Sequence, residues 1–217
     1  MAVSMRQVAT GCLGLSGTIS MTSGVFGYVF GLPARPVALK RQLELARGIA
    51  FDLSVILVGH RNDFSGTISR ADVGRITFAV QRAREIYAQQ SVGVRKVFWT
   101  HIPEEDVGSY TIITDKPEAE DLTDDWSAAN DGVDVFFVQS ILNAGGWSTT
   151  PGPCDKSGKG MSGAVIELSG GDDITGILLA HEVGHYLGLV HFTTITNVMG
   201  VDSNGDGIGE LNSSSTG

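Results

Sequence analysis

Cysteine and basic residues are both scarce in this 217-residue chain. Cys12 and Cys154 are the only cysteines, so at most one intramolecular disulfide can form, and neither has a neighbour spaced for a thiolate zinc cluster. Lys and Arg number 15 against 24 Asp and Glu, which gives a net charge of −9. Because that charge provides no attraction to a phosphate backbone, nucleic acid is not an expected partner.

The sequence also lacks a long continuous apolar run. No residue is charged between Arg6 and Arg35, but glycine, serine and threonine interrupt that stretch throughout, which argues against a membrane-spanning helix. Two interpretations of the region stay open: an exported leader, and a glycine-rich extension or propeptide. A leader would make the protein secreted or extracytoplasmic. No basic amphipathic segment indicates binding to a membrane surface.

The overall composition is that of a globular protein. Hydrophobic residues make up 42 % of the chain and charged residues 18 %, unlike the composition of a disordered chain. A chain of this length can form one domain with a sizeable core. We divide it into a leader, propeptide or extension (residues 1–45), a main domain (46–200) and a polar Asp/Gly/Ser tail (201–217). The sequence does not indicate an oligomeric state.

Hydrophobic patterns predict strands and helices within residues 46–200. The first strand contains a continuous apolar run, typical of a strand that is covered on both faces. Strands are expected at residues 51–58, 95–102, 133–141 and 163–168. One helix is expected from an N-cap at Ser69, with Asp72 three residues on, to about residue 90. A second is expected over residues 174–187.

Acidic side chains carry two further expectations. Asp172 and Asp173 are expected to cap the second helix, where carboxylates can accept hydrogen bonds from free backbone N–H groups. The acidic stretch 115–134 is interpreted as a charged surface loop, with calcium ligands as the alternative. The succession of elements predicts an α/β domain with a mixed sheet and helices packed against it.

Residues 181–191 read His-Glu-Val-Gly-His-Tyr-Leu-Gly-Leu-Val-His. On an α-helix His181 and His185 are one turn apart, so both imidazoles project from one face and can share a metal ion. Gly188 can adopt the left-handed backbone that ends a helix, which lets His191 return to the same ion. Three histidine ligands leave the fourth tetrahedral position open, which is typical of a catalytic zinc site.

This long histidine motif resembles that of the metzincin zinc endopeptidases, in which a methionine-containing turn follows beneath the metal. Met199, within Asn-Val-Met-Gly, supplies a candidate turn, and the short link before it is similar to the matrixin branch. The alternative for Met199 is a loop methionine that fills a gap in the core. Phe192 after the third histidine leaves the branch unassigned. The resemblance covers about residues 51–200.

The resemblance implies a metzincin-like α/β (α+β) catalytic domain. Its parts would be a mixed, mostly parallel twisted sheet, a backing helix and the zinc-motif helix, whereas the usual C-terminal helix has no candidate after Met199. It also implies a zinc-dependent endopeptidase, with a metal-activated water as nucleophile and Glu182 as general base. Two other functions stay open: a non-catalytic module that binds zinc and calcium, and a zinc amidase with a non-protein substrate.

The segment 145–151 lies where the family places its antiparallel edge strand. An extended peptide or protein substrate can pair with such an edge, so Gly146, Trp147 and Ser148 are candidate substrate contacts. A glycine-rich connecting loop is the alternative for this segment.

Two features lie outside the motif. The side chains Asp202, Asn204 and Asp206 alternate in the tail and resemble the start of a calcium loop, although the closing carboxylate is missing. A solvated polar turn is the alternative. Cys12 could block the zinc as a propeptide thiolate, but its surroundings do not match the matrixin switch, which favours a buried or disulfide-bonded cysteine.

Overall fold

The computed structural model describes residues 39–153, 156, 161–168 and 171–191, and the backbone of residues 4–8 and 18–22. Strands β1 (Ser4–Val8) and β2 (Thr18–Thr22) pair antiparallel with each other. No helix in the described ranges is long and apolar enough to cross a membrane. The division into domains stays a prediction. The predicted features that lie outside these ranges also stay predictions; they are Cys12, Cys154, Phe192, Met199, Asp202, Asn204 and Asp206.

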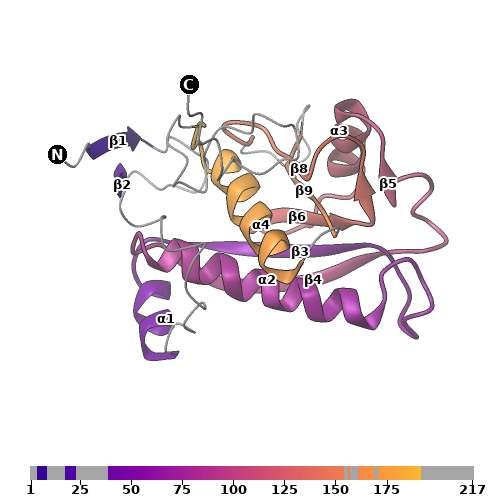
Figure 1. Ribbon diagram of the computed structural model, residues 1–217, viewed down its shortest axis with the longest axis horizontal. Helices are drawn as coiled ribbons and strands as arrows, with labels where there is room; N and C mark the ends of the chain where they lie inside the picture. Colours follow the sequence, from indigo (N-terminus) through magenta and orange to yellow (C-terminus); the bar gives the residue numbers. More distant parts are fainter. Residues whose placement is uncertain are drawn as a thin grey trace, which may run out of the picture.

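The main sheet has five strands in the order β4-β3-β6-β9-β8 (Figure 1). Their bounds are Ala50–His60 for β3, Gly93–Pro103 for β4, Val133–Val138 for β6, Gly146–Trp147 for β8 and Gly163–Glu167 for β9. Strands β4, β3, β6 and β9 are parallel, and β8 pairs antiparallel with β9 at the edge. The prediction of a mixed, mostly parallel sheet is therefore confirmed.

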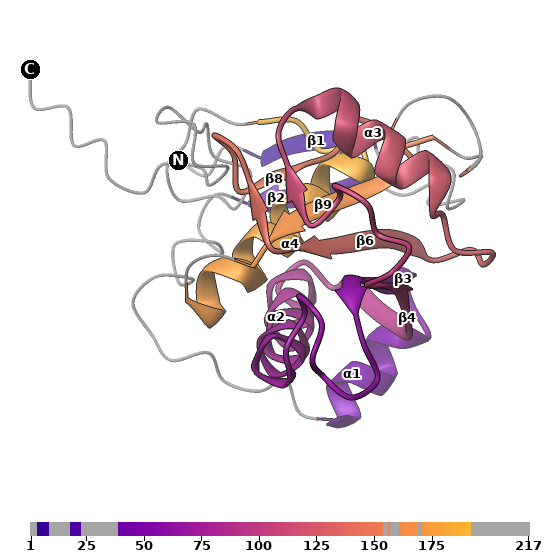
Figure 2. The ribbon, with the colours of Figure 1, turned by 90° about the vertical axis from the view of Figure 1, so that its right-hand side faces the viewer.

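Helices cover both faces of this sheet, which explains its continuous apolar strands. Helices α2 (Arg70–Ala88) and α4 (Asp172–Tyr186) lie on one face, and α3 (Lys116–Asp125) lies on the other (Figure 2). In β3, Val55 joins the core cluster beneath α2 and α4, whereas Ile56 joins the cluster beneath α3. Because successive side chains enter opposite layers, both must be apolar.

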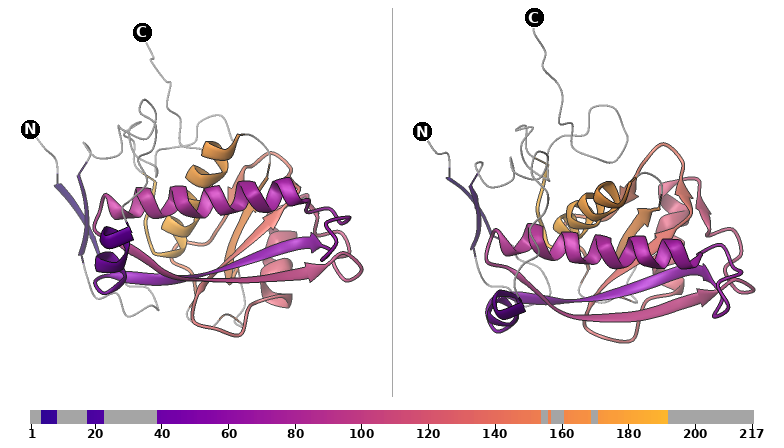
Figure 3. Two further views of the ribbon diagram at one scale, coloured as in Figure 1. Left: turned by 90° about the horizontal axis from the view of Figure 1, so that it is seen from below. Right: turned by 60° about the horizontal axis from the view of Figure 1, so that its bottom comes forward.

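Helix α2 begins at a complete capping box. The Ser69 side chain accepts a hydrogen bond from the backbone N–H of Asp72, and the Asp72 carboxylate accepts one from the backbone N–H of Ser69. These two bonds satisfy backbone donors that a helix start leaves free. The helix then runs alongside β3 and β4 in the crossover between them (Figure 3). The short α1 (Leu39–Ala46) packs near the beginning of β4, where Leu45 approaches Gly93.

Helices α2 and α4 cross at a glycine. A Cβ built on Gly176 of α4 would lie 2.6 Å from both Cβ and Cγ of Arg82 in α2, closer than two carbon atoms can pack. The Tyr87 hydroxyl of α2 also donates a 2.8 Å hydrogen bond to the carbonyl of Ala180. This close crossing fixes α4, and with it the histidine motif, against the framework of the sheet.

The sequence predicts a charged surface loop at 115–134, and that prediction is wrong for residues 116–125 and 133–134, although residues 126–132 form neither helix nor strand. Residues Lys116–Asp125 form α3, whose N-cap Asp115 accepts a 3.0 Å hydrogen bond from the Glu118 N–H. Asp134 lies within β6 and is completely buried. The apolar positions Ala119 and Leu122, which pack into the core, are too few for their helical spacing to stand out among the acidic residues.

Two smaller expectations also need correction. The N-cap of α4 is Gly171, which makes no side-chain capping bond. Asp172 and Asp173 lie in the first turn, where each carboxylate is 3.4 Å from an arginine Nε of α2. The predicted strand 133–141 divides into β6 and the short β7 (Ser140–Ile141), which pairs with β5 (Ile112–Ile113) in a separate small sheet.

Candidate metal centre

Helix α4 ends in a turn that reverses the chain immediately after His185. Gly188 has a φ of 94°, in the left-handed region that favours glycine. Its N–H donates to the carbonyl of His185 at 2.8 Å, and the Leu189 N–H donates to the carbonyl of Gly184 at 2.9 Å. These are the paired bonds of a Schellman motif. The turn brings His191 back beside the helix.

Three imidazoles meet at this turn. The Nε2 atoms of His181 and His185 are 3.1 Å apart, those of His181 and His191 are 3.1 Å apart, and those of His185 and His191 are 3.0 Å apart. His181 and His185 are buried, whereas His191 is exposed. In the part of the chain that the structure describes, no other group of three His, Cys, Asp or Glu side chains is placed to hold a metal ion.

The spacing of the three nitrogens fits a small divalent cation. Zinc–nitrogen bonds of about 2.0–2.1 Å in tetrahedral geometry separate the ligand atoms by about 3.3 Å. The observed distances of 3.0 and 3.1 Å require only a slight outward movement. Imidazole is also a preferred zinc ligand. The donor set and its geometry therefore both fit zinc.

The local environment prepares His185 to be a ligand. Its Nδ1–H donates a 2.8 Å hydrogen bond to the carbonyl of Leu189, which places the ring proton on Nδ1 and leaves the Nε2 lone pair facing the other two rings. Burial lowers the pKa of His185, so the imidazole is favoured in its neutral form. A neutral, oriented imidazole is the form that binds a metal ion.

Glu182 follows His181 in α4 and is not a member of the three-histidine group. Its side chain is only 3 % exposed, and it packs beneath the edge strand β8. A Cβ built on Gly146 of β8 would lie 2.7 Å from Cγ of Glu182. The carboxylate is therefore confined between α4 and the edge strand.

The segment 145–151, for which the sequence left a strand and a loop open, contains the edge strand. Gly146 and Trp147 pair with Ile166 and Val165 of β9, and among the named strands of the sheet β8 has no partner on its other side. Trp147 is half-buried against the core cluster beneath α3, and Ser148 is also half-buried. Contact between these residues and a substrate stays a prediction.

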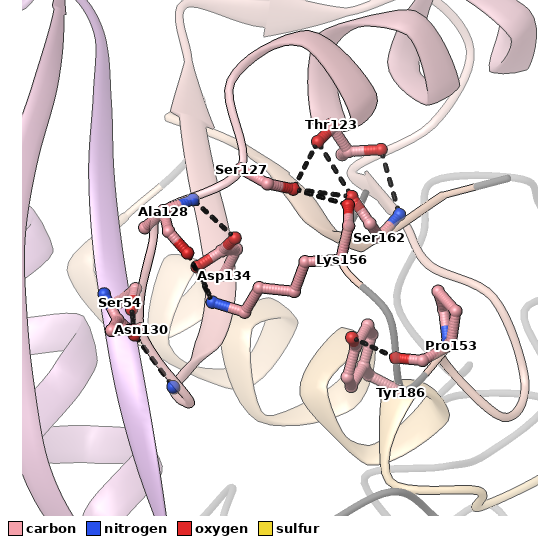
Figure 4. A network of polar contacts seen from close by, with 11 residues as sticks. Ser54, Thr123, Ser127, Ala128, Asn130, Asp134, Pro153, Lys156, Ser162 and Tyr186 are labelled. Carbon is pink, nitrogen blue, oxygen red and sulfur yellow. Dashed lines mark hydrogen bonds and ion pairs between the residues drawn. The ribbon is translucent and has the colours of Figure 1, made fainter. Parts of the chain in front are cut away.

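The chain that follows β8 is held on two sides, through contacts that the sequence did not indicate (Figure 4). On the α4 side, the Tyr186 hydroxyl donates to the carbonyl of Pro153 at 2.8 Å, and the Gly152 N–H donates to the carbonyl of Tyr186 at 2.9 Å. Burial raises the pKa of Tyr186 to about 12, so the hydroxyl keeps the proton that it donates. Tyr186 therefore links the motif helix to the edge-strand connection.

On the sheet side, the same connection is held by an ion pair between the half-buried Lys156 and the buried Asp134. The Lys156 ammonium donates to the Asp134 carboxylate at 2.7 Å and to the carbonyl of Ala128 at 3.2 Å. Burial raises the pKa of Asp134, and the nearby Lys156 opposes that shift. The Ser127 hydroxyl also donates to the carbonyl of Lys156 at 2.9 Å. No sequence signal joins these residues, because Lys156 and Asp134 are 22 positions apart.

The chain was compared with models of protein families, with curated proteins and with solved structures. No model of a protein family matches it, and no curated protein matches it. One similar solved structure is archaemetzincin from Methanopyrus kandleri, with 16 % identity over 76 % of this chain and 91 % of that chain and a TM-score of 0.47. Another is metalloproteinase-II from Bacteroides fragilis, with 13 % identity over 98 % of this chain and 62 % of that chain and a TM-score of 0.45.

Proposed function

We propose that the protein is a zinc-dependent endopeptidase. The observation that carries this proposal is the convergence of the Nε2 atoms of His181, His185 and His191 at 3.0–3.1 Å, together with the buried Glu182, which follows His181 in α4. Three nitrogen ligands with a carboxylate that is not a ligand are the parts that metal-assisted hydrolysis requires.

Each residue has a distinct part in the proposed reaction. His181, His185 and His191 would hold Zn²⁺, which when bound supplies a Lewis acid and lowers the pKa of a water molecule to about 7. Glu182 would accept a proton from the attacking water and then deliver it to the departing amine. Its confinement beneath β8 holds the carboxylate in place, so that little reorganisation is needed when the proton moves.

The edge strand supports a peptide as the substrate. The antiparallel strand β8 lies directly over Glu182, as the close approach of Gly146 shows. An extended peptide that paired with the outer side of β8 would place one of its peptide bonds near the three histidines. Trp147 and Ser148 would then contact the substrate side chains next to that bond.

The proposal can be tested with mixed peptides. Zinc-loaded protein is incubated with a peptide mixture, with and without a chelator, and new termini are identified by mass spectrometry. We expect internal cleavages that the chelator abolishes and added zinc restores. New termini that persist in the chelator would contradict the role of the metal. Cleavage of small non-protein amides, with all peptides left intact, would favour the amidase alternative.

A non-catalytic zinc module is the second candidate function. A structural zinc site normally fills its fourth position with a protein ligand, whereas the described residues supply three ligands. The burial of Glu182 beside the site is also unexplained by a purely structural metal. Zinc binding without any hydrolysis of peptides or amides would favour this alternative.

A further inference from the structure

Gly146 has no room for a side chain. A Cβ at this position would lie 2.7 Å from Cγ and 3.1 Å from Cδ of Glu182, and 3.0 Å from the carbonyl oxygen of Val165. Carbon atoms in proteins pack at about 3.5–4.0 Å. The backbone of β8 therefore fills the space on one side of the Glu182 side chain.

Strand β8 cannot easily retreat from this contact. It pairs with Ile166 and Val165 of β9, and the Glu167 N–H donates a 2.9 Å hydrogen bond to the carbonyl of Gly145. Beyond the strand, the chain is tied to α4 through Gly152 and Tyr186. A side chain added at position 146 would therefore displace Glu182 more readily than it would displace the backbone.

We infer that Gly146 is a positioning residue for Glu182. Because Gly146 has no side chain, its backbone packs directly against the Glu182 side chain and restricts its position. Any larger residue at position 146 would displace the Glu182 carboxylate. The contact itself is independent of catalysis, but its effect on turnover rests on the proposed peptidase function. The prediction is specific to this pair, because Glu182 supplies the shortest distance at position 146.

A double-mutant cycle in the metal-free protein tests the contact without any activity. The G146A substitution should lower the Tm by about 5 °C, because it overpacks a tight site. In an E182A background the Cγ and Cδ atoms that obstruct the new methyl group are gone. The decrease in Tm caused by G146A should then be smaller by about half or more. The remaining decrease would come from the contact with the carbonyl of Val165.

Gly152 provides the matched control for this cycle. A Cβ there would lie 2.2 Å from the Tyr186 ring, and its three nearest atoms all belong to that ring. The G152A substitution should therefore cost the same Tm in the E182A background as in the wild type. If G146A alone does not fold, recovery of folded protein in G146A/E182A supports the contact. Strictly additive Tm losses, or no recovery, would overturn it.

Kinetics test whether the contact positions the base. With zinc content unchanged, G146A should lower kcat by about 10²-fold, the cost of a misplaced catalytic group, and should change KM little. A change confined to KM would show that Gly146 serves only substrate pairing, and an unchanged kcat would overturn the positioning role. If the wild type has no peptidase activity, the proposed function fails, while the Tm cycle still decides the contact.

Discussion

Helices α2 and α4 pack against each other on the same face of the sheet, yet they bury polar groups in opposite ways. In α2 the buried Arg82 pairs with its neighbour Glu85 at 3.4 Å and with Asp173 at 3.4 Å. In α4 the buried His181 and His185 face each other and His191, all through the same ring nitrogen. Opposite charges neutralise one another around Arg82, whereas three like groups, two in α4 and one in the turn after it, converge on a common point.

This difference distinguishes a helix that carries ion pairs from a helix that carries two of the three grouped histidines. The buried Arg82 has ion-pair partners within the protein, Glu85 and Asp173. Three imidazole nitrogens 3.0–3.1 Å apart form a group that a metal cation can bind. The two helices also differ at their starts, because α2 has a full capping box and α4 has none. We therefore interpret α2 as part of the framework and propose that α4, with the turn after it, binds the metal.

The largest expected effect on stability comes from substituting a histidine of the three-histidine group, because the proposed zinc site is then lost. Wild-type protein should bind about one zinc ion per chain, and zinc at 1,000 times its Kd should stabilise the fold by about 4 kcal/mol. The His185→Ala substitution should abolish most of this stabilisation, as measured by thermal unfolding with and without zinc.

A second histidine variant controls for this effect. His101 is exposed on β4 and lies outside the three-histidine group, so His101→Ala should keep both the bound zinc and the zinc-dependent rise in Tm. Equal loss of zinc in the two variants would contradict the proposal that zinc binds specifically at the three-histidine group.

An intermediate effect is expected where the two helices cross. Gly176→Ala would place a methyl group 2.6 Å from Arg82 and should destabilise the protein by about 1–3 kcal/mol. Gly74→Ala on α2 meets no atom within 4 Å and should stabilise it by about 0.4–1 kcal/mol. Denaturant unfolding of both variants measures these changes. A neutral Gly176→Ala would show that the helices do not cross as tightly as described.

The smallest effects are expected at the helix starts. Ser69→Ala removes the capping bond to the Asp72 N–H and should cost about 1 kcal/mol. Gly171→Ser offers α4 the side-chain cap that it lacks and should change stability by only a few tenths of a kcal/mol in the favourable direction. Urea unfolding of the two variants tests this, and a large loss from Gly171→Ser would mean that its backbone does not tolerate a side chain.

Local signals in the sequence were sufficient for α2 and for the parallel strands. The Ser69 cap and the apolar run in β3 act within a few residues, so their outcomes can be read from a short window. The position of α3 was missed because its acidic residues hide two buried apolar positions, Ala119 and Leu122. The sequence predicted α4, but placed its cap on Asp172 and Asp173 instead of Gly171.

The surroundings of the metal centre could not be predicted in the same way. The approach of Gly146 to Glu182, and the pairing of Lys156 with Asp134, join residues from different elements that meet only after the sheet forms. No spacing pattern in the sequence links Gly146 to Glu182 or Lys156 to Asp134. Only the three histidines, which lie within one turn and its reversal, have a spacing that indicates their meeting beforehand.

The Glu182→Gln variant tests the central claim most directly, because it removes a proton carrier and leaves every proposed ligand in place. Zinc content and peptide turnover are measured on the same preparations of wild type and variant. We predict an unchanged zinc content and a fall in kcat of about 10²–10⁴-fold. Peptide turnover equal to that of the wild type would contradict the assignment of Glu182 as the base and, with it, the proposed mechanism.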